Sequence, residues 1–200
     1  MATGTIGFLF EERVGQALAL FEDMLGEGWI FSIYTEQEIR DFFSEQSLNG
    51  VDHMIQVENP QGEQTVFLLQ EKWKLMTNQR EVSQFLDCCA RIDARMPEFK
   101  GKVKRIWVTR TLPTLNGEKS LEEGQVLVIQ SCVSQTLLAY MTTILIAEEI
   151  GARDKAIGLL AKMDPLLPET VAATAAAVSQ FGEKHVTFKK KGVITVRKME

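Results

Sequence analysis

The sequence has few of the residues on which small metal-binding or disulfide-rich proteins depend. Among its 200 residues are three cysteines, two histidines and five prolines. Cys88 and Cys89 are adjacent and Cys132 stands alone, a spacing that fits neither a zinc site nor a disulfide framework. The longest apolar run, near residues 137–147, is interrupted by threonines, whereas a membrane-spanning helix needs about 20 apolar residues. We therefore expect no zinc centre, no disulfides and no membrane span.

A secretion signal and an excess of positive charge are also missing. The first residues contain no basic segment, and Glu11 and Glu12 fall where the apolar part of a signal peptide would continue. The net charge of −5 gives no overall field that would attract nucleic acid, although a carboxylate site adds negative charge that a bound cation cancels. We expect an intracellular globular protein with residues 1–200 in one domain.

Hydrophobic periodicity predicts a mixed α/β fold. The elements expected in the first half are a helix (6–25), strands (29–34, 51–58 and 65–74), a helix (77–96) and a strand (103–110). Asn59-Pro60-Gln61-Gly62 is strong turn chemistry, so the second and third strands should form an antiparallel hairpin. The continuous apolar run at 66–69 predicts that the third strand is covered on both faces.

The second half is expected to add helices and a terminal hairpin. The predicted elements are a loop through Asn116-Gly117, a strand (125–130), a helical stretch (134–161) broken near Gly151, a helix (168–181) and a hairpin (187–198). The element order predicts a mixed sheet flanked by helices.

Polar residues are predicted to meet at one edge of this sheet. Asp52 stands at the head of one hairpin strand, and Gln70 and Lys72 end the other. Because residues two apart share a strand face, Gln70 and Lys72 should point the same way while Glu71 points away. The first helix carries Glu11, with Glu12 as its rival if the helical phase differs by one residue.

Oxygen donors of this kind suit a hard divalent cation, Mg²⁺ or Mn²⁺. Such an ion lowers the pKa of a bound water, and a neighbouring lysine can orient that water or stabilise the charge that develops on a phosphate. A metal-dependent phosphodiesterase would need this combination of carboxylates, amide and lysine.

The pattern Gly50-Val51-Asp52, a turn and a strand ending Gln70-x-Lys72 resembles the PD-(D/E)xK nuclease superfamily. It is most similar to the Mrr-type restriction endonuclease branch, in which glutamine takes the usual acidic position, although Val51 replaces the motif's proline. The Phe10-Glu11 pair also resembles that branch. The likeness covers roughly residues 6–111 and implies a restriction-endonuclease-like αβββαβ core, with 112–200 as a C-terminal extension.

The resemblance also implies the role of each site residue. Asp52 would be the principal metal ligand, Gln70 would contribute a side-chain or neighbouring backbone oxygen, and Glu11 would bind the metal directly or through water. Lys72 would be the catalytic lysine. The implied activity is Mg²⁺- or Mn²⁺-dependent DNA endonuclease cleavage, and cutting both strands of a duplex would suggest a homodimer.

Further residues have both a functional and a structural interpretation. Candidate DNA contacts are two residues beside the site and a run of lysines near the C-terminus: Trp73, Lys74, Lys189, Lys190 and Lys191. Packing is the alternative for Trp73, and a solvated strand edge is the alternative for the lysine run. His53 should point to the other sheet face, where we expect a structural role, and assistance to the site is its alternative.

Two other functions are consistent with the same residues. A nuclease-fold protein without catalytic activity could bind DNA or a protein partner, and an unrelated α/β structural protein could match the motif by chance. Metal binding at Asp52 tests the first alternative, because a non-catalytic protein need not keep it. Convergence of Asp52, Gln70 and Lys72 tests the second, because a chance match need not bring the three side chains together.

Overall fold

The computed structural model describes residues 3–131, 135–163, 186–187 and 194–198. The described elements are α1 (Thr3–Leu25), β1 (Ile30–Thr35), α2 (Glu36–Phe42), β2 (His53–Glu58), β3 (Gln64–Lys72), α3 (Gln79–Asp93), the short helix η1 (Pro97–Phe99), β4 (Val103–Thr109), α4 (Leu115–Glu123), β5 (Leu127–Ser131), α5 (Gln135–Glu149), α6 (Arg153–Met163), β6 (Val186–Thr187) and β7 (Ile194–Lys198).

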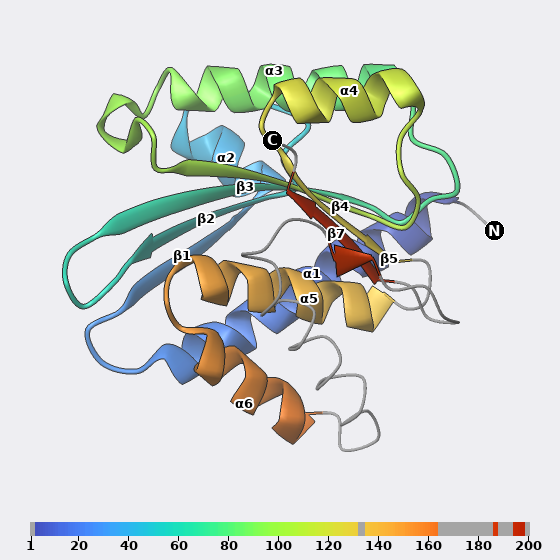
Figure 1. Cartoon of the computed structure of the whole chain (residues 1–200). Helices are drawn as coiled ribbons and strands as arrows, with labels where there is room; N and C mark the ends of the chain where they lie inside the picture. The colour runs from blue at the N-terminus through green and yellow to red at the C-terminus, as the bar shows by residue number, and fades with distance from the viewer. Residues whose placement is uncertain (1–2, 132–134, 164–185, 188–193, 199–200) are drawn as a thin grey trace.

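The described strands form one mixed sheet in the order β1-β2-β3-β4-β5-β7-β6 (Figure 1). β1, β2 and β3 are consecutive antiparallel neighbours, whereas β4 and β5 continue parallel to β3. The predicted hairpin between β2 and β3 is confirmed. Its turn is held by Asn59, whose Oδ1 accepts the backbone N–H groups of Gln61 at 3.0 Å and Glu63 at 2.8 Å.

Helices cover both faces of the sheet, which confirms the predicted α/β architecture (Figure 1). One apolar cluster joins the sheet to α1, α5 and α6, and a second joins the opposite face to α2, α3 and α4. In β3, Phe67 and Leu69 belong to the first cluster and Val66 and Leu68 to the second, because successive strand residues point to opposite faces. All four side chains are fully buried, as the apolar run predicts.

The predicted loop through Asn116-Gly117 is wrong, because these residues lie in α4. Asn-Gly usually indicates a turn. Here the glycine instead allows close packing: a Cβ at Gly117 would lie 2.7 Å from Pro113 Cβ and 3.3 Å from Val82 Cγ2 of α3. Local turn preference therefore yields to helix–helix packing.

The described residues after 111 add strands to the same sheet and helices to the layers that cover it. β5 pairs with β4, and α5 packs beside α1 in the first apolar cluster. The predicted helical break is confirmed at Gly151, where φ is +74° between α5 and α6. β6 and β7 pair antiparallel as predicted, while the predicted helix at 168–181 and the hairpin turn lie outside the described residues. No described helix is long and apolar enough to cross a membrane.

Candidate active site

Asp52 is positioned by the hairpin and by the glycine two residues before it. Its backbone N–H donates to the carbonyl oxygen of Leu69 at 2.8 Å, so the β2–β3 pairing extends one residue beyond β2. Gly50 has φ +111°, and a Cβ there would lie 3.1 Å from the carbonyl oxygen of Gln84 on α3. Only glycine combines this backbone conformation with so close an approach. The buried side chain of Val51 then holds this segment in the second apolar cluster, which includes residues of α3.

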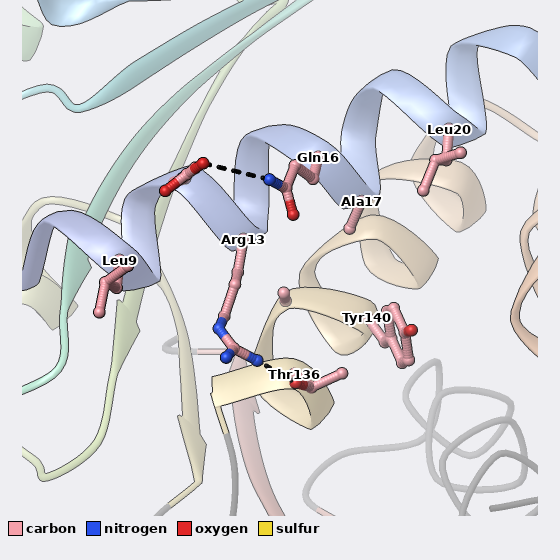
Figure 2. A pocket seen from close by; sticks show the side chains of 9 residues that line it. Leu9, Arg13, Gln16, Ala17, Leu20, Thr136 and Tyr140 are labelled. Carbon is pink, nitrogen blue, oxygen red and sulfur yellow. Dashed lines mark hydrogen bonds between the residues drawn. The ribbon is translucent and has the colours of Figure 1, made fainter. Parts of the chain in front are cut away.

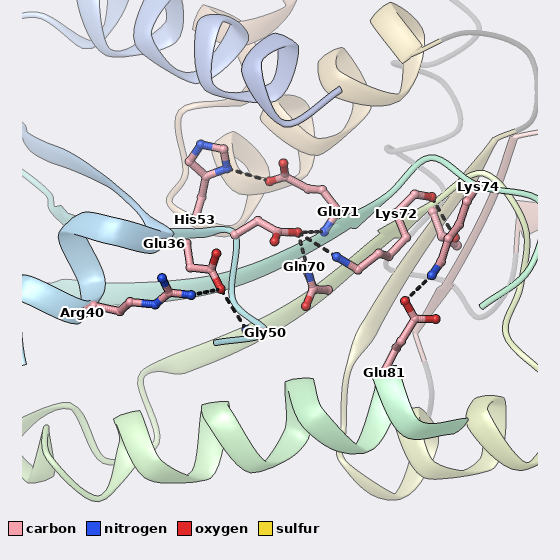
Figure 3. A network of polar contacts seen from close by, with 11 residues as sticks. Glu36, Arg40, Gly50, His53, Gln70, Glu71, Lys72, Lys74 and Glu81 are labelled. Atoms are coloured by element: carbon pink, nitrogen blue, oxygen red, sulfur yellow. Dashed lines mark hydrogen bonds and ion pairs between the residues drawn. The ribbon is translucent and has the colours of Figure 1, made fainter. Parts of the chain in front are cut away.

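Asp52, Gln70 and Lys72 converge on one oxygen atom (Figure 3). Asp52 Oδ2 accepts hydrogen bonds from the side-chain amide of Gln70 and, at 2.6 Å, from the backbone N–H of Glu71. Lys72 Nζ lies 3.5 Å from the same oxygen. The structure therefore brings together the three residues that the sequence places at the centre of the site, at the carboxyl end of β3.

Glu71 points to the opposite face of β3 and contacts His53 there (Figure 3). Glu71 Oε1 lies 2.9 Å from His53 Nδ1, and the two residues are only 1% and 5% exposed. Burial alone lowers the pKa of His53, but the Glu71 carboxylate, its hydrogen bond and the nearby Asp52 and Glu11 raise it to about 9. Burial raises the pKa of Glu71, an effect that the charge of His53 partly offsets. This buried pair lies directly beside the candidate site in sequence, because His53 follows Asp52 and Glu71 lies between Gln70 and Lys72.

Glu11, not Glu12, is the helix carboxylate next to this group. Glu11 is half-buried on α1, and its pKa is raised to about 7 by burial and then by the negative charge of Asp52, with Lys72 acting in the opposite direction. Glu12 is exposed and accepts a hydrogen bond from Gln16 at 3.3 Å. The structure therefore settles which of the two glutamates faces the strands.

Glu12 instead lines a cavity of about 450 Å³ between α1 and α5 (Figure 2). Across this cavity Arg13 Nη1 donates to Thr136 Oγ1 at 2.7 Å. This hydrogen bond links α1 to α5.

Replacing Glu11 by glutamine is expected to stabilise the metal-free protein above neutral pH. The pKa of the Glu11 carboxyl rises from 4.5 to about 7 on folding, so its stabilising contribution is complete below 4.5 and is lost as the pH rises through about 7. After a discount for solvent screening, the substitution should gain about 1 kcal/mol, or roughly 2–4 °C in Tm, at about pH 8 and little at about pH 4. Thermal unfolding at both pH values measures this.

Glu12→Gln is the matched control, because that side chain is exposed on the next helical position. Its Tm should follow the wild type at both pH values. A Glu11→Gln protein that unfolds at a lower Tm than wild type above neutral pH would contradict the unfavourable burial and charge repulsion assigned to the Glu11 carboxylate.

The donor atoms around Asp52 suit a hard cation. The carboxylates of Asp52 and Glu11 supply oxygen, the donor type that Mg²⁺ and Mn²⁺ prefer, whereas Gln70 directs its amide NH₂ group at Asp52. Within the described residues every recorded side-chain contact of Asp52 uses Oδ2, so Oδ1 is available to a ligand. No group of three or more His, Cys, Asp or Glu side chains in the described part of the chain is arranged to hold a metal. A cation here would therefore complete its coordination with amide or backbone oxygen and water.

The predicted DNA contacts are placed differently from one another. The Trp73 ring packs with its centroid 5.6 Å from that of Phe10, and the Arg110 guanidinium lies 5.4 Å from the Trp73 centroid. Lys74 forms an ion pair with Glu81 on α3. Trp73 therefore packs between α1 and the end of β4, and Lys74 stands beside the site. Lys189, Lys190 and Lys191 lie outside the described residues.

The sequence did not reveal the coupling between His53 and Glu71. The one available signal was a glutamate just after the apolar run at 66–69 and predicted to point to the face opposite Gln70 and Lys72, where a charged residue needs a buried partner. The partner is diagonal across the hairpin, because His53 is paired in register with Leu69.

Comparisons of this chain with protein-family models, curated proteins and solved structures find no match. The resemblance to PD-(D/E)xK nucleases therefore rests on the motif residues and on how they are arranged.

Proposed function

We propose that this chain is a Mg²⁺- or Mn²⁺-dependent DNA endonuclease of the PD-(D/E)xK type. The observation that carries the proposal is the convergence of Gln70, Lys72 and the Glu71 backbone N–H on Asp52 Oδ2, with the Glu11 carboxyl close enough to feel the charge of Asp52. A chance motif would not require these groups to share one oxygen. The site also lies at the carboxyl ends of parallel strands, where open α/β sheets commonly bind ligands.

Each residue has a distinct part in this proposal. Asp52 and Glu11 would hold the cation, which when bound supplies Lewis acidity toward a phosphate oxygen and lowers the pKa of water. Lys72 is 21% exposed at its side chain, so its ammonium group can face a phosphate while remaining near Asp52. Without a bound cation, the pKa of about 7 lets Glu11 take up or release a proton near neutral pH, and coordination of a cation would hold this carboxyl deprotonated.

A second candidate is a protein of similar architecture that binds DNA or a protein partner without cleaving it. The orientation of Gln70 favours this alternative, because its amide NH₂ group, not its oxygen, is directed at Asp52. In that arrangement the amide donates a hydrogen bond to Asp52 and Lys72 supplies the positive charge that a cation would otherwise provide. Metal binding and cleavage distinguish the two functions.

The test is cleavage of supercoiled plasmid by the wild-type protein in Mg²⁺, in Mn²⁺ and in excess chelator. We expect nicked or linear products with at least one metal and none with chelator, because the two carboxylates need a cation to approach a phosphate. Titration calorimetry of the metal alone accompanies the assay. A folded protein that neither binds the metal nor cuts DNA would contradict the proposal and favour the non-catalytic alternative.

A further inference from the structure

Large apolar side chains are exposed at the end of the sheet that carries the candidate site. Leu75 is 69% exposed and Met76 is 80% exposed in the loop after β3, and Leu115 is 83% exposed at the start of α4. We call these three residues the apolar tip. Single exposed apolar residues are common, but exposed ones on two adjoining segments, the loop after β3 and the start of α4, indicate a contact surface.

The two loops that carry the apolar tip run side by side. Thr111 Oγ1 donates to the carbonyl oxygen of Lys74 at 3.0 Å, and Thr114 N–H donates to that of Thr77 at 3.3 Å. Both loops lie at the same end of the sheet (Figure 1). The apolar tip is therefore supported by backbone contacts on both sides, and it begins three residues after Lys72.

Basic residues lie in the two segments that carry the apolar tip, and Glu81 and Glu118 follow directly after those segments. Residues 72–80 and 109–117 contain four basic residues and no Asp or Glu, in a protein of net charge −5: Lys72, Lys74, Arg80 and Arg110. Lys74 is paired with Glu81 just beyond the first segment, and Lys72 contacts Asp52. Arg80 is exposed, whereas Lys72, Lys74 and Arg110 are partly buried. Cations close in sequence to exposed apolar side chains match a ligand that presents phosphates and flat apolar rings together.

We propose that the apolar tip packs against unpaired bases, and that the preferred substrate is DNA whose bases are unstacked next to the cleaved phosphate, as at a fork. This inference rests on the proposed nuclease function and specifies its substrate. In a continuous duplex each base face is covered by the neighbouring base, so the apolar tip would bury little apolar surface on binding. At a fork it can bury apolar surface on an exposed base while Lys72 and Arg110 contact the adjacent phosphates.

The test compares binding to forked and fully paired DNA in chelator, so that cleavage plays no part. Fluorescence anisotropy with labelled DNA of equal length gives the two affinities for wild type and for the Leu75→Ser/Met76→Ser double variant. We expect the double variant to lose about tenfold in affinity for the fork and less than about twofold for the duplex. The exposure of both side chains means that the substitutions should leave the fold intact, which thermal unfolding checks.

Ile30→Ser is the matched control. Ile30 is 58% exposed and pairs with Glu58, at the end of β2 far from Asp52. It should bind both DNAs as wild type does. A wild-type protein that cleaves plasmid but binds fork and duplex equally would overturn the substrate inference and leave the nuclease proposal standing.

Two further results would also contradict the substrate inference. If the wild-type protein binds neither DNA and does not cleave plasmid, both the substrate inference and the proposed function fail. Sedimentation could instead show that the wild type is a dimer and the double variant a monomer, with the same preference for the fork. In that case the apolar tip joins two copies of this chain and does not contact bases.

Discussion

Lys72→Ala is expected to slow DNA cleavage at least about 100-fold, the usual cost of removing one preorganised charge from a transition state. Lys72 Nζ lies 3.5 Å from Asp52 Oδ2 and is held at the end of β3, beside the position proposed for the phosphate. Alanine removes the ammonium group but leaves the Gln70 and Glu71 contacts of Asp52. Initial rates of plasmid nicking, measured with saturating metal, give the ratio.

Lys119→Ala is the matched control for this variant. Lys119 lies on α4, is 74% exposed at its side chain and contacts Glu123 at 3.8 Å, so its loss removes the same charge from the molecule away from Asp52. Its nicking rate should be within about twofold of wild type, because exposed ion pairs of this kind contribute little. A Lys72→Ala protein that nicks at the wild-type rate would contradict the role assigned to the lysine.

Asp52→Asn separates metal binding from the lysine's contribution. Asparagine keeps an oxygen that can accept the Glu71 backbone N–H, but it lacks the charge that attracts a divalent cation. We expect this variant to lose both cleavage and metal binding, whereas Lys72→Ala loses cleavage and keeps metal binding. Calorimetric titration of the two proteins with Mn²⁺ distinguishes them.

The strand pair at the site was predictable because its register depends on local chemistry. Asn59 and Gly62 form a tight turn, and a hairpin turn fixes which residues of the two strands face one another. Asp52 and Gln70 therefore had to lie on neighbouring strands. Their contact with Lys72 follows from the two-residue repeat of β3.

Features that depend on tertiary packing were not predictable in the same way. Glu11 and Glu12 differ by one helical position, and only the burial of Phe10 and Val14 against the sheet shows which glutamate faces Asp52. The pairing of His53 with Glu71 depends on α1 covering that face. Gly15 of α1 permits the close approach, since a Cβ there would lie 3.3 Å from His53 Nε2.

The buried pair of His53 and Glu71 gives the largest expected effect on stability. Replacing either residue alone by leucine leaves the other as an unpaired buried ionisable group, which typically costs about 3–5 kcal/mol. Glu71 Oε2 already has no hydrogen-bond partner among the described residues, so the pair is incompletely satisfied in the wild type. Replacing both by leucine should therefore restore most of the free energy of unfolding. Urea denaturation of the wild type, both single variants and the double variant measures the coupling between them.

The pH dependence of these proteins provides a second test of the same pair. Folding raises the pKa of His53 from 6.5 to about 9, so the stabilising contribution of its charge is complete below 6.5 and is lost as the pH rises through about 9. The double-leucine variant lacks this titratable group. Its free energy of unfolding should therefore rise relative to that of the wild type as the pH increases through about 9. Single-variant losses that simply add in the double variant would show that the two side chains are not coupled.

If the double variant is as stable as the wild type but cleaves DNA more slowly, the pair contributes to the site and not to the stability of the fold, because Asp52 and Glu11 then lack the positive charge of His53.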